Sequence, residues 1–360
     1  MTILFLIGNL DSGGAERVAA VLINAWVSRA DRVVLGLTTS GTINYDLSKE
    51  VEVECIYRTN QWPTAVYKIR TIRKLINEIK PTVIISFLPN VNILSIVANL
   101  YTGIPLIISE RIHPFFYSKF FYLRVLKYIL YGQTNAIVCQ THGVLIATKF
   151  FNKKKVINAV IPNPCDNDFI SNTCKYENKP KMTLLSVGRL TYQKQHHLLI
   201  TVFHKLSNEF PNWELKIVGS GELRHSLDDQ ILNLNMQHKI RIHERSFNIV
   251  ADYQNAHIFA MCSTFEGFPN ALMEAMAIGL PCISFDCLSG PAELSDGGKN
   301  LLLIEQLDIS GFETALKLLM KNEQLRHYYG TKAKNHVRDS LNLNSIVRKW
   351  DDLFTSIRER

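Results

Sequence analysis

The feature of this sequence that most restricts its fold is a repeated alternation of short, continuously apolar runs with longer helical patterns. Runs rich in β-branched residues, with no polar alternation, are typical of parallel strands buried on both faces of a sheet. The helical runs between them complete β-α-β units, so we predict an α/β protein with doubly wound parallel sheets. The predicted strands are Thr2–Ile7, Arg32–Leu37, Thr82–Ser86, Leu106–Ser109, Ala136–Cys139, Met182–Val187, Trp213–Val218, Ile240–His243, Ile258–Met261 and Pro281–Phe285.

The alternation stops near Asn163, and residues 162–181 are rich in Asn, Asp, Lys and Pro without any periodicity. A chain of 360 residues is also long for a single core. We therefore predict two Rossmann-like domains, residues 1–165 and 182–343, joined by a linker over residues 166–181. We expect the domains to face each other across a cleft, with ligands at the carboxyl ends of the strands.

The net charge of +8 is unevenly distributed. Residues 1–170 hold 18 Lys and Arg against 11 Asp and Glu, whereas the remainder holds 22 against 21. The first domain therefore suits an anionic partner. No helix-turn-helix, zinc or RNA-binding signature accompanies the charge, so we expect no nucleic-acid partner. A phosphorylated lipid, an anionic membrane surface and a mildly basic solvated face all remain open.

The seven cysteines are scattered and include no Cys-x-x-Cys pair, which is typical of reduced thiols in the cytoplasm. Met1–Leu10 lacks a basic start and a cleavage site, and we predict a first strand there, not a signal peptide. Asn90, Asn92 and Asn99 interrupt the most apolar stretch, so we predict no membrane-spanning helix.

One polar motif follows a predicted strand of the second domain. Ser186-Val-Gly-Arg-Leu-Thr-Tyr-Gln-Lys194 contains Arg189 and Lys194 directly after Gly188. A Gly at a strand end lets the backbone approach a ligand closely, and a following helix offers free amides. The Arg fork matches phosphate oxygens, while Lys acts as a point charge. We interpret the motif as a phosphate site; a solvent-exposed turn is the alternative reading.

A second motif has two carboxylates around a helix start. Glu266-Gly-Phe-Pro-Asn-Ala-Leu-Met-Glu274 is predicted to be a loop followed by a helix that begins at Pro269 or Asn270. Carboxylates near the amide-rich start of a helix are held ionised, and they accept hydrogen bonds from vicinal hydroxyls. Glu266 and Glu274 therefore suit a ribose and a hexose, although a lone Glu commonly caps or solvates a helix. Together the two motifs predict a pocket for a nucleotide sugar.

Both motifs resemble the signatures of glycosyltransferase family 4, retaining enzymes of the GT-B fold. The resemblance covers the second domain and, more loosely, the first, and it departs from the family at Gln195 and Leu301, where Gly is frequent. Further segments that match in order and spacing are Val218-Gly-Ser-Gly-Glu222, Ser263-Thr-Phe-Glu266, Glu274-Ala-Met-Ala277 and Gly290-Pro-Ala-Glu293.

The resemblance implies a metal-independent enzyme that needs no cofactor and uses a nucleotide diphosphate sugar, most simply a UDP-sugar. Arg189 and Lys194 would hold the donor diphosphate and Glu266 the hydroxyls of the transferred hexose, which makes these three the implied catalytic residues. Glu274 would take the ribose hydroxyls. The last helix, residues 344–360 with Trp350, would pack back on the first domain. The other implied donor-binding residues are Gly14, Gly188, Phe268, Pro269, Asn270, Ala271 and Leu272.

Two segments of the first domain also resemble the family. Gly8-Asn-Leu-Asp-Ser-Gly-Gly-Ala-Glu-Arg17 is not Gly-x-Gly-x-x-Gly, so a nicotinamide cofactor is not indicated. It resembles a loop of members that build bacterial surface polysaccharides, which implies Gly13 on the acceptor side; a helix-starting turn explains the glycines almost as well. Ser109-Glu-Arg-Ile-His-Pro114 resembles another family segment, and implies that Arg111 and His113 reach the transferred sugar or the acceptor phosphate.

The segment Phe115–Tyr131 interleaves aromatic residues with Lys119, Arg124 and Lys127. This composition is typical of a helix in a membrane interface, and a buried helix with a basic exposed edge fits equally well. Because family acceptors are often polyprenyl-diphosphate sugars, we expect the first domain to contact an anionic membrane at the inner face of the cytoplasmic membrane. Asp166-Asn-Asp168 copies a metal-binding motif, but its place in the expected linker argues against a metal site.

The sequence thus predicts a retaining glycosyltransferase that moves a hexose or N-acetylhexosamine to a lipid-linked oligosaccharide for a bacterial capsule, O-antigen or related polysaccharide. Two alternatives remain. Sugar-nucleotide 2-epimerases share the GT-B architecture but need further acid/base carboxylates. A non-catalytic partner subunit would have no need of the charged residues Arg189, Lys194, Glu266 and Glu274.

Overall fold

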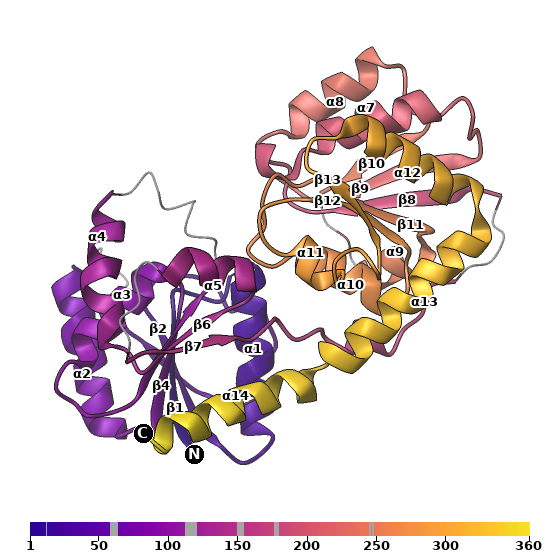
Figure 1. Cartoon of the computed structure of the whole chain (residues 1–360). Coiled ribbons are helices and arrows are strands. Elements are labelled where there is room, and N and C mark those ends of the chain that lie inside the picture. Colours follow the sequence, from indigo (N-terminus) through magenta and orange to yellow (C-terminus); the bar gives the residue numbers. More distant parts are fainter. Residues whose placement is uncertain are drawn as a thin grey trace. The chain divides into compact units, whose positions relative to one another are not determined.

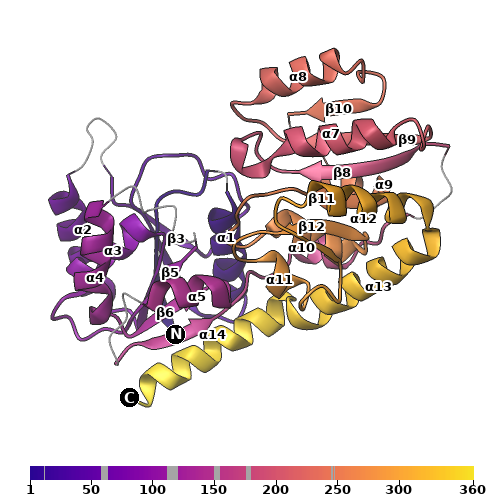
Figure 2. The same ribbon diagram turned by 45° about the horizontal axis from the view of Figure 1, so that its top comes forward.

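The computed structural model describes residues 1–11, 13–57, 64–111, 121–149, 155–175, 180–244, 246 and 248–360. The chain divides into two compact units. Unit 1 comprises Met1–Pro164 and Leu343–Arg360, and unit 2 comprises Cys165–Asn342. Each unit is a parallel sheet with helices packed against it (Figures 1 and 2). The predicted α/β class with doubly wound parallel sheets is therefore confirmed.

The seven-stranded sheet of unit 1 has the order β3-β2-β1-β4-β5-β6-β7, and every neighbouring pair is parallel. The strand order reverses between β1 and β4, which is the point where ligands bind in doubly wound sheets. The elements of unit 1 are β1 (Thr2–Ile7), α1 (Gly14–Val27), β2 (Arg32–Leu37), β3 (Glu52–Cys55), α2 (Ala65–Ile79), β4 (Val83–Phe87), α3 (Pro89–Asn99), β5 (Leu106–Glu110), α4 (Phe121–Leu130), a 3₁₀ turn (Tyr131–Gln133), β6 (Ala136–Cys139), α5 (His142–Thr148), β7 (Ile157–Val160) and α14 (Leu343–Arg358).

The two faces of this sheet bury different clusters, because successive side chains of a strand point to opposite sides. Leu4 and Leu6 face the cluster that also takes in residues of α2 and α3. Phe5, between them, packs on Trp26 of α1 at a ring-centroid distance of 6.3 Å. Trp26 in turn meets Trp350 of α14 edge to face at 5.9 Å, so the last helix of the chain forms part of the core of unit 1.

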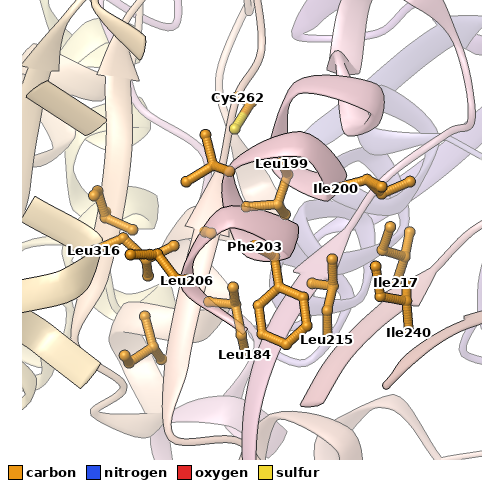
Figure 3. Packing of buried hydrophobic residues seen from close by; sticks show 14 of the residues in the cluster. Leu184, Leu199, Ile200, Phe203, Leu206, Leu215, Ile217, Ile240, Cys262 and Leu316 are labelled. Atoms are coloured by element: carbon orange, nitrogen blue, oxygen red, sulfur yellow. The ribbon is translucent and has the colours of Figure 1, made fainter. Parts of the chain in front are cut away.

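Unit 2 has a six-stranded parallel sheet with the order β10-β9-β8-β11-β12-β13. Phe203 and its neighbours on α7 pack against Leu184 and Leu215, which lie on two neighbouring strands of this sheet, as Figure 3 shows. The elements of unit 2 are α6 (Asn167–Ile170), β8 (Met182–Val187), a 3₁₀ turn (Tyr192–Lys194), α7 (His196–Leu206), β9 (Trp213–Val218), α8 (Arg224–Asn233), β10 (Ile240–His243), α9 (Ile249–Asn255), β11 (Ile258–Met261), α10 (Asn270–Ile278), β12 (Cys282–Asp286), α11 (Pro291–Leu294), β13 (Leu302–Glu305), α12 (Ile309–Lys321) and α13 (Glu323–Ser340).

The structure differs from the sequence prediction in the segment 166–181, expected to be a linker. Asp166 caps the short helix α6 by accepting a hydrogen bond from the Asp168 amide at 3.1 Å, which is a structural role for that Asp-x-Asp motif. Phe169 is buried and packs edge to face on Tyr253 at 5.6 Å. The described part of this segment is therefore part of unit 2, and its aperiodic sequence reflects loops that lie against a domain.

The C-terminal region also differs, because it holds α13, a helix that the sequence analysis did not predict. Its buried residues are Arg326, Gly330, Ala333 and Val337. Two of these four are small and one is charged, so they form no apolar stripe that a sequence pattern would reveal. Arg326 is accommodated by donating to the Leu319 carbonyl oxygen at 2.8 Å, at the end of α12.

Candidate functional site

The site in unit 2 is built at the carboxyl end of the central strand β8. Gly188 follows this strand directly, and Lys194 lies in the 3₁₀ turn before α7. A Cβ atom at position 188 would lie 3.3 Å from Cδ and Cε of Lys194, which is a tight contact. Gly188 therefore gives the aliphatic part of Lys194 room to lie across the strand end. Arg189, next in sequence, is exposed, and no side-chain partner holds it among the described residues.

Lys194 and Glu266 form an ion pair that joins the two sequence motifs. Lys194 Nζ lies 2.6 Å from Glu266 Oε1, and the two side chains are only 15% and 7% exposed. Glu266 comes from the loop after β11, and β11 is paired with β8 in the sheet. The sequence analysis assigned these residues to different parts of the ligand. Because they are in contact, a ligand that reaches one of them is within reach of the other.

Backbone contacts through Gln193 keep the two loops together. The Gln193 carbonyl oxygen accepts from the Thr264 amide at 2.8 Å, and the Gln193 side-chain amide donates to the Phe265 carbonyl oxygen at 2.9 Å. These bonds flank Lys194 on one loop and Glu266 on the other. The pair therefore rests on a hydrogen-bonded scaffold, which limits the rotamers available to both side chains.

Glu274 is placed on α10 and is nearly buried. Its Oε2 accepts a hydrogen bond from the Tyr253 hydroxyl at 3.0 Å. Tyr253 lies on α9 and is itself fully buried between aromatic rings, Phe169 on one side and Phe259 on the other. The rigid Tyr253 ring therefore orients the Glu274 carboxylate. Sequence reasoning missed Tyr253, because nothing in the pattern Ile249–Asn255 marks it as more than a core aromatic.

The N-terminus of α10 supplies backbone donors beside these carboxylates. Its N-cap is Pro269, which makes no side-chain cap. The Asn270 amide donates to the Phe268 carbonyl oxygen at 3.0 Å, and the next two amides, of Ala271 and Leu272, have no acceptor within the helix. Phe268, Asn270, Ala271 and Leu272 lie at this helix start, where the sequence analysis expected donor contacts. A helix N-terminus carries a partial positive charge and favours anions.

A second glycine shapes this helix start. Gly290 caps α11 with a φ of +107°, a conformation that residues with a Cβ rarely adopt. A Cβ there would lie 2.6 Å from Pro269 Cδ, closer than two non-bonded carbon atoms approach. Only Gly at position 290 allows α11 to begin directly against the start of α10. This explains why the Gly-Pro-Ala-Glu segment belongs with the site.

The N-cap and the first residue of α7 have unusual environments. Gln195 has a left-handed backbone with φ of +48°, so this chain tolerates a strained residue at a position where the sequence comparison expected Gly. The next residue, His196, is buried, and Ser186 Oγ lies 3.5 Å from its Nδ1. Burial, followed by the charge of Lys194, lowers the pKa of His196 to about 4. The imidazole is therefore neutral at physiological pH and contributes no charge to the site.

The described residues offer no metal site: no group of three or more His, Cys, Asp or Glu side chains among them is arranged to hold an ion. Near the pair, burial and then the charge of Glu266 raise the pKa of the Cys287 thiol. Cys287 therefore stays protonated and is not a nucleophile.

In unit 1, Gly13 and Gly14 lie at the start of α1, which follows β1. The Tyr45 hydroxyl accepts from the Gly13 amide at 3.0 Å and donates to the Gly13 carbonyl oxygen at 2.9 Å. These two bonds fix the backbone at the helix start. Gly13 and Gly14 are exposed at the carboxyl end of β1, which is next to the reversal of strand order.

Arg111 lies at the carboxyl end of β5 and is an unusual buried cation. It is 5% exposed, its guanidinium carbon lies 3.9 Å from the centroid of the Phe87 ring, and its Nη1 donates to Asn163 Oδ1 at 2.6 Å. No carboxylate contacts it, and Nε has no partner among the described residues. Burial lowers the pKa of Arg111 to about 9. His113, predicted beside it, lies outside the described residues.

Comparison with known proteins shows what this chain is similar to. Residues 173–336 match the family model described as "Glycosyl transferases group 1". The whole chain is 28% identical over 99% of its length to an α-1,4-N-acetyl-D-galactosaminyltransferase of Campylobacter jejuni, covering 99% of that protein. It is also 27% identical to the amylovoran biosynthesis glycosyltransferase AmsD of Erwinia amylovora, with 98% of each chain covered.

Solved structures agree on the fold. Anabaena Alr3699/HepE, determined with UDP and glucose, superposes with a TM-score of 0.85 at 17% identity and covers 99% of this chain and 100% of its own. Sucrose-phosphate synthase from Thermosynechococcus elongatus gives a TM-score of 0.85 at 12% identity, with 99% of each chain covered. The chain therefore has the GT-B fold.

Proposed function

We propose that this chain, a homologue of bacterial glycosyltransferases with a group 1 domain over residues 173–336, is a retaining enzyme of glycosyltransferase family 4. It transfers a hexose or N-acetylhexosamine from a UDP-sugar to a lipid-linked oligosaccharide in bacterial surface-polysaccharide biosynthesis. One observation carries the proposal: the partly buried Lys194–Glu266 pair lies at the end of β8, in the same unit as the start of α10, which has no side-chain cap, and the carboxylate of Glu274.

In the proposed mechanism the donor binds to unit 2. Lys194 and Arg189 contact the diphosphate, and the amides at the start of α10 add neutral donors to the same anion. As the bond between sugar and diphosphate breaks, negative charge grows on the leaving oxygen, and preorganised cations stabilise that state more than the ground state. Glu266 keeps Lys194 in place and accepts hydrogen bonds from hydroxyls of the transferred sugar.

Glu274 binds the ribose hydroxyls. Two oxygens of a carboxylate match two vicinal hydroxyls, and the hydrogen bond from Tyr253 helps to orient Glu274. The acceptor binds to unit 1, where Gly13 and the buried cation Arg111 lie at the carboxyl edge of the sheet. Arg111 has no carboxylate partner, so an acceptor phosphate would neutralise it.

The relatives support the choice of substrates. The Campylobacter jejuni relative is named for an acceptor linked to undecaprenol through a diphosphate, and the HepE structure was solved with UDP and with UDP-glucose. On this basis we place the enzyme at the inner face of the cytoplasmic membrane, with an anionic membrane surface as a partner of unit 1. The 2-epimerase and the non-catalytic subunit are the alternatives that the experiment below separates from transfer.

The test is UDP release from a panel of UDP-hexoses and UDP-N-acetylhexosamines, with and without a lipid extract of the source membrane. Wild type is compared with Lys194→Ala and Glu274→Gln. The matched control is Lys205→Ala, which removes a Lys that is also paired, with Glu313 at 3.0 Å, but lies exposed on the surface of unit 2. Release with one donor that is raised by lipid, retained in the control and lost in both site variants supports transfer.

Other outcomes favour the alternatives. UDP release that needs no lipid and yields a free hexosamine, or a sugar nucleotide of changed configuration, identifies an epimerase. The absence of UDP binding by calorimetry, with GDP- and ADP-sugars also tested, supports the non-catalytic subunit.

A further inference from the structure

Helix α4 of unit 1 exposes most of its apolar side chains, which is the reverse of the usual arrangement for a helix on the surface of a water-soluble domain. Only Leu123 and Lys127 are buried, although the helix has ten residues. A surface helix normally turns its apolar stripe inward and its charges outward. Here the buried side contains a lysine, and the exposed side contains six large apolar or aromatic residues, with exposed fractions from 36% to 75%: Phe121, Tyr122, Val125, Leu126, Tyr128 and Ile129.

A buried charge cluster holds the helix in this orientation. Lys127 Nζ lies 3.1 Å from Glu110 Oε2, with the two side chains 2% and 0% exposed, and the Tyr131 hydroxyl donates to Glu110 Oε1. Removing one member of such a cluster leaves an uncompensated charge in the interior. Rotating α4 to bury its apolar side would withdraw Lys127 from Glu110. The cluster therefore specifies which side of α4 faces the solvent.

The apolar surface continues beyond the helix. Tyr101, in the turn after α3, is fully exposed and has a positive φ of 67°, a conformation that is uncommon for a residue with a large side chain. Between Tyr101 and the end of α4 lies a hollow of about 460 Å³, whose walls combine apolar side chains such as Leu100 and Ile129 with the amides of Asn99, Gln133 and Asn135. We call the six exposed residues of α4 together with Tyr101 the apolar face. Figures 1 and 2 both show α4 beside α3 at the edge of unit 1.

The chain around this face is strongly basic. Residues 64–130 contain nine Lys and Arg but only two acidic residues, Glu78 and Glu110. Glu110 is already paired inside the protein, and Arg124 is exposed on α4 itself. On α2, which packs on α3, Arg70 and Lys74 are exposed as well. Aromatic and aliphatic side chains beside exposed cations match the interface of a bilayer that contains anionic lipids.

From these observations we infer that the apolar face docks unit 1 on the surface of an anionic lipid bilayer, with α4 lying flat in the interface. Within the described residues, no helix combines the length and the apolar character needed to cross a membrane. The inference rests on the proposed function for its purpose, because a lipid-linked acceptor is presented at such a surface. The evidence for the inference, which is the orientation and charge of α4, does not depend on the proposed function.

A bilayer is favoured over a second copy of the chain by charge. Two copies meeting through this face would bring two basic surfaces together, and like charges across an interface are unfavourable. An anionic bilayer neutralises the exposed cations, and its apolar interior removes the exposed apolar side chains from water. Tyr122 and Tyr128 suit a lipid interface further, because a phenol has an apolar ring and a polar tip.

The test is co-sedimentation of the full chain with vesicles of phosphatidylcholine, alone or mixed with phosphatidylglycerol. The test variant is Phe121→Ser/Ile129→Ser, and the matched control is Leu232→Ser/Leu318→Ser, which removes two residues of unit 2 that are 57% and 52% exposed. We expect wild type and control to bind the mixed vesicles, and the partition coefficient of the test variant to fall about tenfold or more. We expect Arg124→Gln to weaken binding to mixed vesicles only.

Three results would overturn the inference. The first is equal vesicle binding by the test and control variants. The second is unchanged amide exchange of residues 121–130 when mixed vesicles are added to wild type. The third is a wild type that is dimeric and a test variant that is monomeric, with neither protein binding vesicles. UDP binding, measured by calorimetry on the same samples, separates the two proposals. Its absence in a wild type that binds vesicles as expected contradicts the proposed function and leaves the docking surface supported.

Discussion

Lys194 Nζ and Glu266 Oε1 lie 2.6 Å apart although 72 residues separate them in sequence. The pair brings the cation of the first motif and the carboxylate of the second into one contact, at the ends of the hydrogen-bonded strands β8 and β11. Each side chain is therefore part of the environment that positions the other. The first prediction follows from this mutual dependence.

We expect Lys194→Ala to lower the rate of UDP release by about 100-fold or more, because a preorganised cation beside the leaving group is lost. Glu266→Gln should also lower the rate, since it frees Lys194. The double variant should be little worse than Lys194→Ala alone, because contacting residues act as a unit. Steady-state kinetics of the four proteins measures this, with Lys205→Ala as control. Strictly additive losses would show that the pair does not act as one element.

Tyr253→Phe removes the hydroxyl that donates to Glu274 but keeps the ring between Phe169 and Phe259. We expect UDP binding to weaken by about 5- to 10-fold, the usual effect of losing one hydrogen bond to a charged group. Titration calorimetry with UDP measures the change. Tyr328→Phe, at a half-exposed residue of α13, is the control and should bind UDP as wild type does. Unchanged UDP affinity in Tyr253→Phe would mean that Glu274 does not depend on the hydroxyl.

Lys127→Met should reduce the free energy of unfolding by about 3–5 kcal/mol, because it leaves Glu110 charged and buried without its cation. Lys127→Met combined with Glu110→Gln should lose less than the single variant, since the buried charge is then removed as well. Urea unfolding followed by circular dichroism measures both. The control is Lys74→Met, whose exposed pair with Glu78 at 3.6 Å should contribute at most about 1 kcal/mol. A double variant that is less stable than Lys127→Met would contradict this account.

His196 should make stability depend on pH in the acidic range. Its folded-state pKa of about 4 lies below the usual 6.5, so between these values the unfolded chain binds a proton that the folded chain excludes. The contribution is therefore complete above pH 6.5 and is lost as the pH falls towards 4, to a total of about 3 kcal/mol. Urea unfolding at a series of pH values should show a flatter dependence for His196→Gln. The exposed His225→Gln is the control and should keep the wild-type slope; identical slopes in all three proteins would refute the assignment.

Local pattern predicted much of the secondary structure. The bounds of β1, β2 and β8 agree with the prediction to the residue, because strands that are largely buried on both faces appear in the sequence as short apolar runs. The strand β3 (Glu52–Cys55) was missed, since it is an edge strand whose residues are all exposed. Helix α13 was missed for the related reason that small residues form its buried side.

The candidate site divides in the same way. The two motifs marked Lys194, Glu266 and Glu274, because the neighbouring sequence predicts the strand end or helix start beside which each charged residue lies. Tyr253 and His196 have no such context: each is an ordinary helical residue in sequence, and each acquires its importance from what surrounds it. The orientation of α4 belongs with them, because an aromatic, basic segment is equally compatible with a buried and an exposed apolar side.

The sequence by itself determined the alternation of strands and helices, the two doubly wound parallel sheets and the charged residues of the two motifs, because hydrophobic period and turn chemistry act over a few neighbouring residues. The GT-B architecture was implied by the resemblance of those motifs to a known family. Tertiary structure alone decided that Lys194 meets Glu266, that Tyr253 orients Glu274, and that Lys127 is drawn inward to Glu110 while the apolar residues of α4 face outward. These residues are far apart in the sequence and come into contact only when the sheets form. The free energy of a buried charge depends on its partner, and a local sequence pattern does not show which residue that partner is.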